Sequence, residues 1–117
     1  MQAFDLSDKV SVITGAGSGI GKSIAAVFSQ HGSQVYMLDV DEEAARATEK
    51  EIHDADGKAH FIPCNVADQQ EVRKVMQTIF DESGRIDILV NNAGVAHIGN
   101  VETTTEEDMD RIYNINI

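Results

Sequence analysis

The chain has 117 residues, enough for one domain with a sizeable buried core. Its 9 Lys and Arg against 20 Asp and Glu give a net charge of -11, which repels the phosphates of nucleic acids and anionic membranes and excludes both as partners. The single Cys64 cannot form an internal disulfide, and no apolar run approaches the roughly 20 residues of a membrane span. With no signal-peptide pattern at the N-terminus, we expect a cytoplasmic protein.

The first predicted unit is a strand, a glycine-rich turn and a helix. Residues 10–13, which are apolar except for Ser11, predict the strand. Gly15, Gly17, Gly19 and Gly21 follow in what we call the glycine turn (residues 15–21). A helix is indicated next by apolar residues at helical spacing, Ile20, Ile24, Val27 and Phe28, and we expect Gly32 to end it in a left-handed conformation. Glycines let the main chain approach a pyrophosphate closely, and the helix directs N–H groups at the anion, so this order predicts a phosphate-binding site.

The second predicted strand, Gln34–Leu38, ends directly before Asp39. A carboxylate there, roughly 20 residues after the glycines, can accept hydrogen bonds from an adenosine ribose. Alternatively Asp39 is a turn residue or a helix N-cap, and both interpretations can hold together. A glycine turn and an acid in this register make dinucleotide binding the leading hypothesis.

The rest of the chain continues to alternate between helix and strand. We expect Gly57 to end the helix that follows the second strand, and Gly84 to end the next one. Pro63 stops the strand between these two helices, and Thr104 with Glu107 forms a capping box for the last helix. In chain order we expect a helix over 41–55 with an inner stripe of Ala44, Thr48 and Ile52, a strand over 59–62, a helix capped by Asp68 with an apolar stripe of Val72, Val75, Met76, Ile79 and Phe80, a strand over 86–90, and a helix from 104 to 117.

This alternation predicts a parallel sheet covered by helices on both faces, in an α/β fold. In such sheets ligands bind beyond the carboxyl ends of the strands. The candidate residues Gly15, Asp39, Asn65 and 91–94 all follow predicted strands, so we expect them to line one groove.

Several motifs together resemble the N-terminal part of a short-chain dehydrogenase/reductase. Thr14-Gly15 with Gly19 and Gly21 matches that family's TGxxxGxG turn, and residues 91–94 match its NNAG motif. Residues 87–90 and 110–112 also resemble the family's sequence at the corresponding places, so the resemblance covers residues 9–116. It implies that residues 1–117 are the N-terminal part of one NAD(P)-binding Rossmann domain, a doubly wound parallel sheet with strand order 3-2-1-4. It also implies an oxidoreductase that transfers a hydride between the nicotinamide and a small-molecule alcohol or carbonyl substrate. The full-length parent is then expected to be a homo-oligomer.

The resemblance also assigns roles to individual residues. Asp39 takes the adenosine ribose, Asn65-Val66 borders the adenine, and Asn116, in the last helix, matches the catalytic asparagine that holds a water in the proton relay. The remaining cofactor-binding residues are those of the glycine turn and of the NNAG motif: Gly15, Ser18, Gly19, Ile20, Gly21, Asn92, Ala93 and Gly94.

Charge at Asp39 favours NAD over NADP, because a carboxylate repels a 2′-phosphate. The two places where a basic residue would receive that phosphate hold Ser18 and Val40, and Asp41 adds a second negative charge. The four histidines form no metal-binding pattern, and Cys64 is expected to be a buried, inert thiol, so we predict no metal site.

The family's catalytic Ser and Tyr-x-x-x-Lys have no match in the chain. Tyr36 and Tyr113 are its only tyrosines, and neither has a lysine four residues later. We therefore expect a fragment of an enzyme about twice as long. In a fragment the strand over 86–90 would have an exposed apolar edge. We expect the fragment either to associate through this edge or to be partly disordered at its last helix. The alternatives are a non-catalytic dinucleotide-binding module and, less consistent with the TGxxxGxG spacing, an S-adenosylmethionine-dependent methyltransferase.

A first prediction follows from the missing proton donor. The purified 117-residue chain should produce no NADH from NAD and an alcohol, because no residue matches the family's tyrosine and lysine. Absorbance of NADH at 340 nm measures this, and alcohol-dependent NADH formation by the chain would contradict it.

Overall fold

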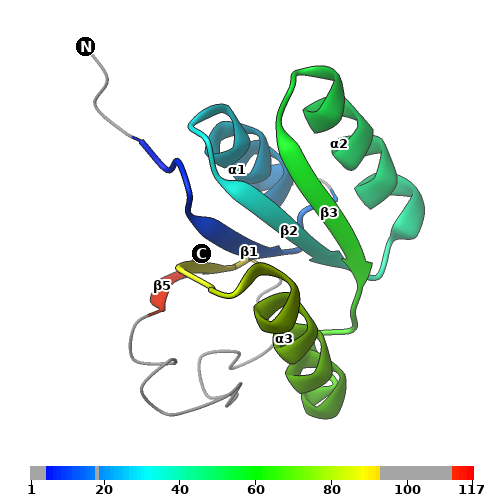
Figure 1. Ribbon diagram of the computed structural model, residues 1–117. Helices are drawn as coiled ribbons and strands as arrows, with labels where there is room; N and C mark the ends of the chain where they lie inside the picture. The colour runs from blue at the N-terminus through cyan, green and yellow to red at the C-terminus, as the bar shows by residue number, and fades with distance from the viewer. Residues whose placement is uncertain (1–4, 18, 93–111) are drawn as a thin grey trace.

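The computed structural model describes residues 5–17, 19–92 and 112–117 (Figure 1). Within them five parallel strands form one sheet in the order β3-β2-β1-β4-β5, with the first four strands in the predicted order. In chain order the elements are β1 (Val10–Thr14), α1 (Gly19–Gln30), β2 (Gln34–Asp39), α2 (Glu42–Asp54), β3 (Lys58–Pro63), α3 (Gln69–Ser83), β4 (Ile88–Asn91) and β5 (Tyr113–Asn116).

Helices cover both faces of the sheet, as the alternating sequence predicts. In Figure 1, α1 and α2 lie on one face and α3 on the other. Successive strand residues point to opposite faces, so on β2 Tyr36 and Leu38 pack in the cluster with α3, whereas Val35 and Met37 pack in the cluster with α1 and α2. Both faces of the central strands are buried, which explains their nearly continuous apolar sequence.

Helix α3 confirms the predicted cap and apolar stripe. The Asp68 carboxylate accepts hydrogen bonds from the N–H groups of Gln70 and Glu71, at 3.1 and 3.2 Å, and Gly84 ends the helix with a left-handed φ of 79°. Four residues of the stripe are buried: Val72, Val75, Met76 and Ile79. Phe80 is partly buried and packs against them.

Helix α1 turns a different face to the sheet from the one that its large apolar residues predict. Its buried residues are Gly21 and Ala25, whereas Ile20 and Val27 are 59% and 44% exposed. Ile24 and Phe28 pack partly buried at the margin of the core. Small residues at the contact let the helix backbone come close to the sheet, and that proximity determines which side chains are covered. Two of the four apolar residues that indicated the helix, Ile20 and Val27, thus lie outside the core.

The end of the chain is a strand, which contradicts the predicted helix to residue 117. Residues 104–111 lie outside the described part, but Tyr113–Asn116 forms β5 and pairs with β4 in parallel. The N–H groups of Tyr113 and Ile117 donate to the carbonyls of Asp87 and Asn91, at 2.9 and 3.2 Å. Backbone groups on the outer side of β4 thus have partners, and this gain overrides the local helical pattern. The β4 edge that we expected to be open is covered.

Across the described residues, no helix has the length and apolarity that a membrane crossing requires.

The Asp87 carboxylate connects the beginnings of β1 and β4. It accepts hydrogen bonds from the Val10 N–H and from Arg85 Nε and Nη2, each at 2.8 Å. Burial alone raises the pKa of Asp87, but the bonds from Arg85 and Val10 outweigh it, so the pKa lies below its ordinary value.

A second prediction concerns stability in acid. Because the folded-state pKa of Asp87 is lowered, its stabilising contribution is complete above the ordinary pKa of about 3.9 and is lost as the pH falls through the folded value. We expect Asp87→Asn to be less stable at pH 7 and to show a shallower loss of unfolding free energy below about pH 4. Denaturant unfolding at several pH values measures both. Asp81→Asn, on the exposed side of α3, is the control, and equal pH slopes for wild type and Asp87→Asn would contradict the prediction.

Candidate functional site

The predicted site residues that the structure describes meet at the carboxyl ends of the strands. A cavity of about 190 Å³ there is lined by Gly15 after β1, by Leu38, Asp39 and Val40 at the end of β2, and by Cys64, Asn65 and Val66 after β3. Backbone hydrogen bonds hold these ends together, from Gly15 N–H to the Leu38 carbonyl and from Cys64 N–H to the Asp39 carbonyl, at 2.8 and 3.1 Å. Four predicted cofactor residues thus share one cavity: Gly15, Asp39, Asn65 and Val66.

Asp39 joins the glycine turn to the start of α2. Its Oδ2 accepts a hydrogen bond from the Gly17 N–H at 2.9 Å, and its Oδ1 accepts one from the Asp41 N–H at 3.0 Å. The N-cap of α2 is Asp41, whose carboxylate accepts from the Ala44 N–H at 3.1 Å. Asp39 is therefore the last residue of β2 and not the N-cap of α2, and each of its oxygens keeps a further lone pair for a ligand hydroxyl.

The glycine turn needs glycine for two different reasons. Gly15 and Gly19 have φ angles of 63° and 61°, which residues with a Cβ rarely adopt. At Gly21 the reason is contact, because a Cβ would lie 2.1 Å from the Gly15 carbonyl oxygen. Beside Gly19 a Cβ would meet no atom within 4 Å, so the first turn of α1 faces open space that a phosphate could enter.

Asn92 ties the end of β4 to the glycine turn. Its N–H donates to Thr14 Oγ1 at 2.9 Å, and its Nδ2 donates to the Gly15 carbonyl oxygen at 3.3 Å. These two bonds fix the end of β4 to the end of β1 and to the glycine turn. Ser18, Ala93 and Gly94 lie outside the described residues.

The segment after β3 forms one wall of the cavity. Asn65 Oδ1 accepts from the Ala67 N–H at 3.0 Å, which fixes the orientation of the amide, and Val66 is buried in the core cluster that contains α3. Cys64 is buried as expected, and this burial, together with the charges of Glu71 and Asp68, raises the pKa of its thiol to about 11. A thiol with that pKa is not a nucleophile at neutral pH.

Asn116 lies at the carboxyl end of β5, on a strand rather than on the predicted helix. The cavity also lies at the carboxyl ends of the strands. Asn116 is paired in register with Asn91 of β4 and is exposed. Ile20, in the first turn of α1, is also exposed.

Sequence reasoning missed two residues at the site. Gly17 was not among the predicted cofactor residues, yet its N–H holds Asp39, and only the folded chain brings the two together. Cys64 lines the cavity and directly follows β3, so its place at a strand end was a usable signal.

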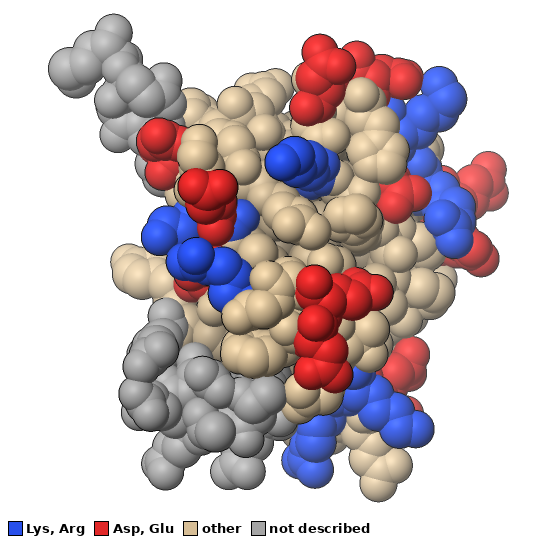
Figure 2. Space-filling model, in the orientation of Figure 1, with Lys and Arg blue, Asp and Glu red and all other residues tan. Residues whose placement is uncertain are grey.

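Charges of both signs are interspersed on the face shown in Figure 2. None of the residues that line the cavity is basic. An anionic ligand would therefore depend on local N–H groups and the helix dipole rather than on a positive field. Over the described residues, no group of three or more His, Cys, Asp or Glu side chains could hold a metal ion.

Parallel strands in this order, with a glycine turn and an acid at the strand ends, define a Rossmann-type α/β protein. The chain belongs to the short-chain dehydrogenase family, whose model matches residues 9–117.

Three relatives illustrate the range of the family. An uncharacterized oxidoreductase of Thermotoga maritima is 45% identical over 111 residues, which cover 93% of this chain and 43% of the relative. A 7α-hydroxysteroid dehydrogenase solved with NADH and 7-oxo glycochenodeoxycholic acid is 38% identical, with a TM-score of 0.72 over 75% of this chain and 34% of its own. A metagenomic short-chain oxidoreductase solved with NADP is 39% identical, with a TM-score of 0.75 over 77% of this chain and 41% of its own. The chain thus spans less than half the length of the relatives that it matches.

A third prediction tests the contact between α1 and the glycine turn. Gly21→Ala should lower the unfolding free energy by about 3 kcal/mol or more, because the added Cβ meets backbone that cannot move aside. Ser23→Ala, on the exposed side of the same helix, should change it by no more than about 0.5 kcal/mol. Chemical denaturation measures both, and similar stabilities of the two variants would contradict the tight contact.

Proposed function

We propose that the chain binds NAD at the carboxyl ends of β1 to β4 and is the cofactor-binding part of an oxidoreductase that acts on an alcohol or carbonyl substrate. The observation that carries this proposal is the joint lining of one cavity by Gly15, Asp39, Asn65 and Val66, beside the open first turn of α1. Membership of the short-chain dehydrogenase family supports it.

The residues present fit a dinucleotide. The lone pairs left on the Asp39 carboxylate accept from ribose hydroxyls, and Asn65 and Val66 border the adenine. The glycine turn, with Ser18 and the exposed Ile20, holds the pyrophosphate at the N-terminus of α1. Asn92, with Ala93 and Gly94, lies against the centre of the cofactor.

The nicotinamide, when bound, supplies the hydride acceptor and donor for alcohol and carbonyl chemistry. Asn116 holds a water of the proton relay, and its place opposite Asn91 at the same sheet edge supports that role. Because the chain contains no Tyr-x-x-x-Lys, it binds the cofactor without turning over substrate.

The preference for NAD rests on charge. The Asp39 carboxylate lines the cavity beside Val40, where a basic residue would be needed to neutralise a 2′-phosphate. Relatives have been solved with NADH and with NADP, so family membership alone does not decide the cofactor. We further propose that the protein works in the cytoplasm, which its single free cysteine supports, and that its parent is a homo-oligomer.

A fourth prediction tests the role of Asp39. Wild type should bind NAD more tightly than NADP, and Asp39→Asn should weaken NAD binding about tenfold and remove most of the preference, because a charge-assisted hydrogen bond and the repulsion of the 2′-phosphate are both lost. Isothermal titration calorimetry with each dinucleotide measures this.

The control is Asp56→Asn, at the opposite end of the sheet in the turn before β3. Asp56 has a φ of 65°, which asparagine tolerates, so this variant removes one carboxylate with little strain. Tighter binding of NADP by wild type would overturn the cofactor assignment, and no binding of either dinucleotide would overturn the proposed function.

A further inference from the structure

The carbonyl oxygen of Gly17 accepts a hydrogen bond from a side chain of α2, far along the chain. Thr48 Oγ1 donates to it at 3.2 Å, and Thr48 is only 1% exposed. Gly17 is itself buried, so without this donor its carbonyl would have to turn toward another partner. Together with the bond from the Gly17 N–H to Asp39, both polar groups of this glycine are held by side chains.

The bond of Thr48 differs from what a threonine in a helix usually does. Helical threonines commonly donate to the carbonyl four residues earlier, and Thr78 of α3 does so, to the Lys74 carbonyl at 3.0 Å. Thr48 instead donates across to the glycine turn. A buried hydroxyl that donates to the Gly17 carbonyl, instead of to a carbonyl of its own helix, restricts the conformation of the glycine turn.

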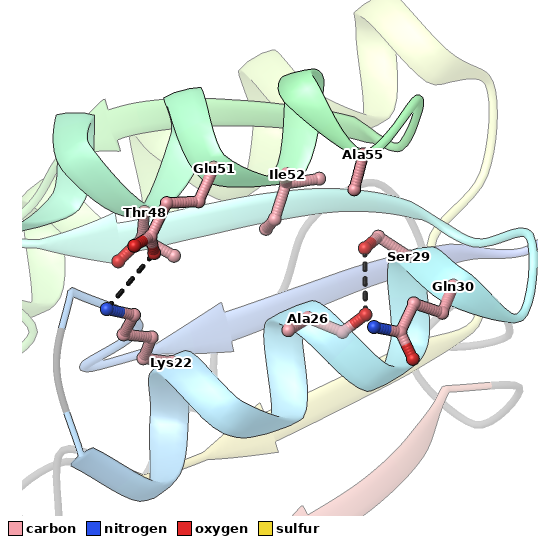
Figure 3. A pocket seen from close by; sticks show the side chains of 8 residues that line it. All are labelled: Lys22, Ala26, Ser29, Gln30, Thr48, Glu51, Ile52 and Ala55. Atoms are coloured by element: carbon pink, nitrogen blue, oxygen red, sulfur yellow. Dashed lines mark hydrogen bonds and ion pairs between the residues drawn. The ribbon is translucent and has the colours of Figure 1, made fainter.

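Side chains of α1 and α2 meet beside Thr48. Figure 3 shows it at one end of a groove of about 100 Å³ between the two helices. Lys22 Nζ and Glu51 Oε2 form an ion pair across this groove at 3.0 Å, and Ile52 lies on the turn after Thr48. The space for a Cβ at Gly17 is also taken, since it would lie 2.8 Å from Asp39 Oδ2 and 3.1 Å from the Ala45 N.

We infer that Thr48 is a positioning residue for the glycine turn, and that it acts through the Gly17 carbonyl to hold the turn in the conformation that binds pyrophosphate. This inference rests on the proposed function. A turn whose peptide groups are already held loses little freedom when the ligand binds, whereas a turn that samples other conformations binds more weakly in proportion to the competent fraction.

The test compares Thr48→Val, which keeps the shape and removes the donor, with Thr48→Ser, which keeps the hydroxyl. Each folded variant is titrated with NAD by calorimetry and with adenosine, which lacks the pyrophosphate, by NMR. Thr48→Val should bind NAD about tenfold more weakly than wild type and adenosine nearly unchanged, and Thr48→Ser should restore NAD binding to within about threefold. Thr78→Val, the same change at the back-bonded threonine, should bind both ligands as wild type does.

A measurement without ligand separates the two proposals. Amide hydrogen exchange at Gly17 should be faster in Thr48→Val than in wild type and Thr78→Val, because the turn opens more often. Wild-type binding of NAD combined with unchanged binding by Thr48→Val would overturn the inference alone. An equal loss of NAD and adenosine binding, or no rescue by serine, would also overturn it, since either result indicates general damage. Failure of wild type to bind NAD would overturn the proposed function, whatever the exchange at Gly17.

Discussion

The Asp39 carboxylate accepts one backbone hydrogen bond with each oxygen, from Gly17 in the glycine turn and from Asp41 at the start of α2. It therefore fixes the turn after β1 to the turn after β2, and residues of both turns line the cavity. A carboxylate so held has a defined orientation before any ligand arrives, which reduces the entropic cost of binding. The same group places a negative charge at the cavity, and this charge is the basis of the proposed preference for a free ribose hydroxyl over a phosphate.

Other contacts extend this arrangement to the neighbouring strands. Asn92 brings the end of β4 to Thr14 and the Gly15 carbonyl, and the close packing at Gly21 brings α1 to the same carbonyl. Most of these contacts involve backbone atoms, so the shape of the site depends on main-chain geometry. Small residues at Gly15, Gly17 and Gly21 are a consequence, since a Cβ at each position meets either an unfavourable φ or another atom.

The two edges of the sheet differ in how they are protected. On β3, the Phe61 N–H donates to Glu49 Oε2 and the Ala59 carbonyl lies 2.8 Å from His53 Nε2, so side chains of α2 occupy backbone groups of the edge strand. On the other side β5 covers β4 and becomes the edge itself. Occupied backbone groups cannot pair with a strand of another molecule, which limits association through β3.

The sequence by itself determined the order of strands and helices as far as β4, the parallel sheet and the placing of Gly15, Asp39, Asn65 and Val66 at one end of it. These follow from local patterns, because hydrophobic periodicity, glycines and capping residues act over a few positions. Only the tertiary structure decided that α1 buries Gly21 and Ala25 rather than Ile20, that Tyr113–Asn116 is a strand, and that Thr48 donates to Gly17. Each of these depends on groups that are distant in the chain. Helix α1 lies against the turn after β1, the outer side of β4 needs backbone partners, and the Thr48 hydroxyl donates to a carbonyl outside its own helix.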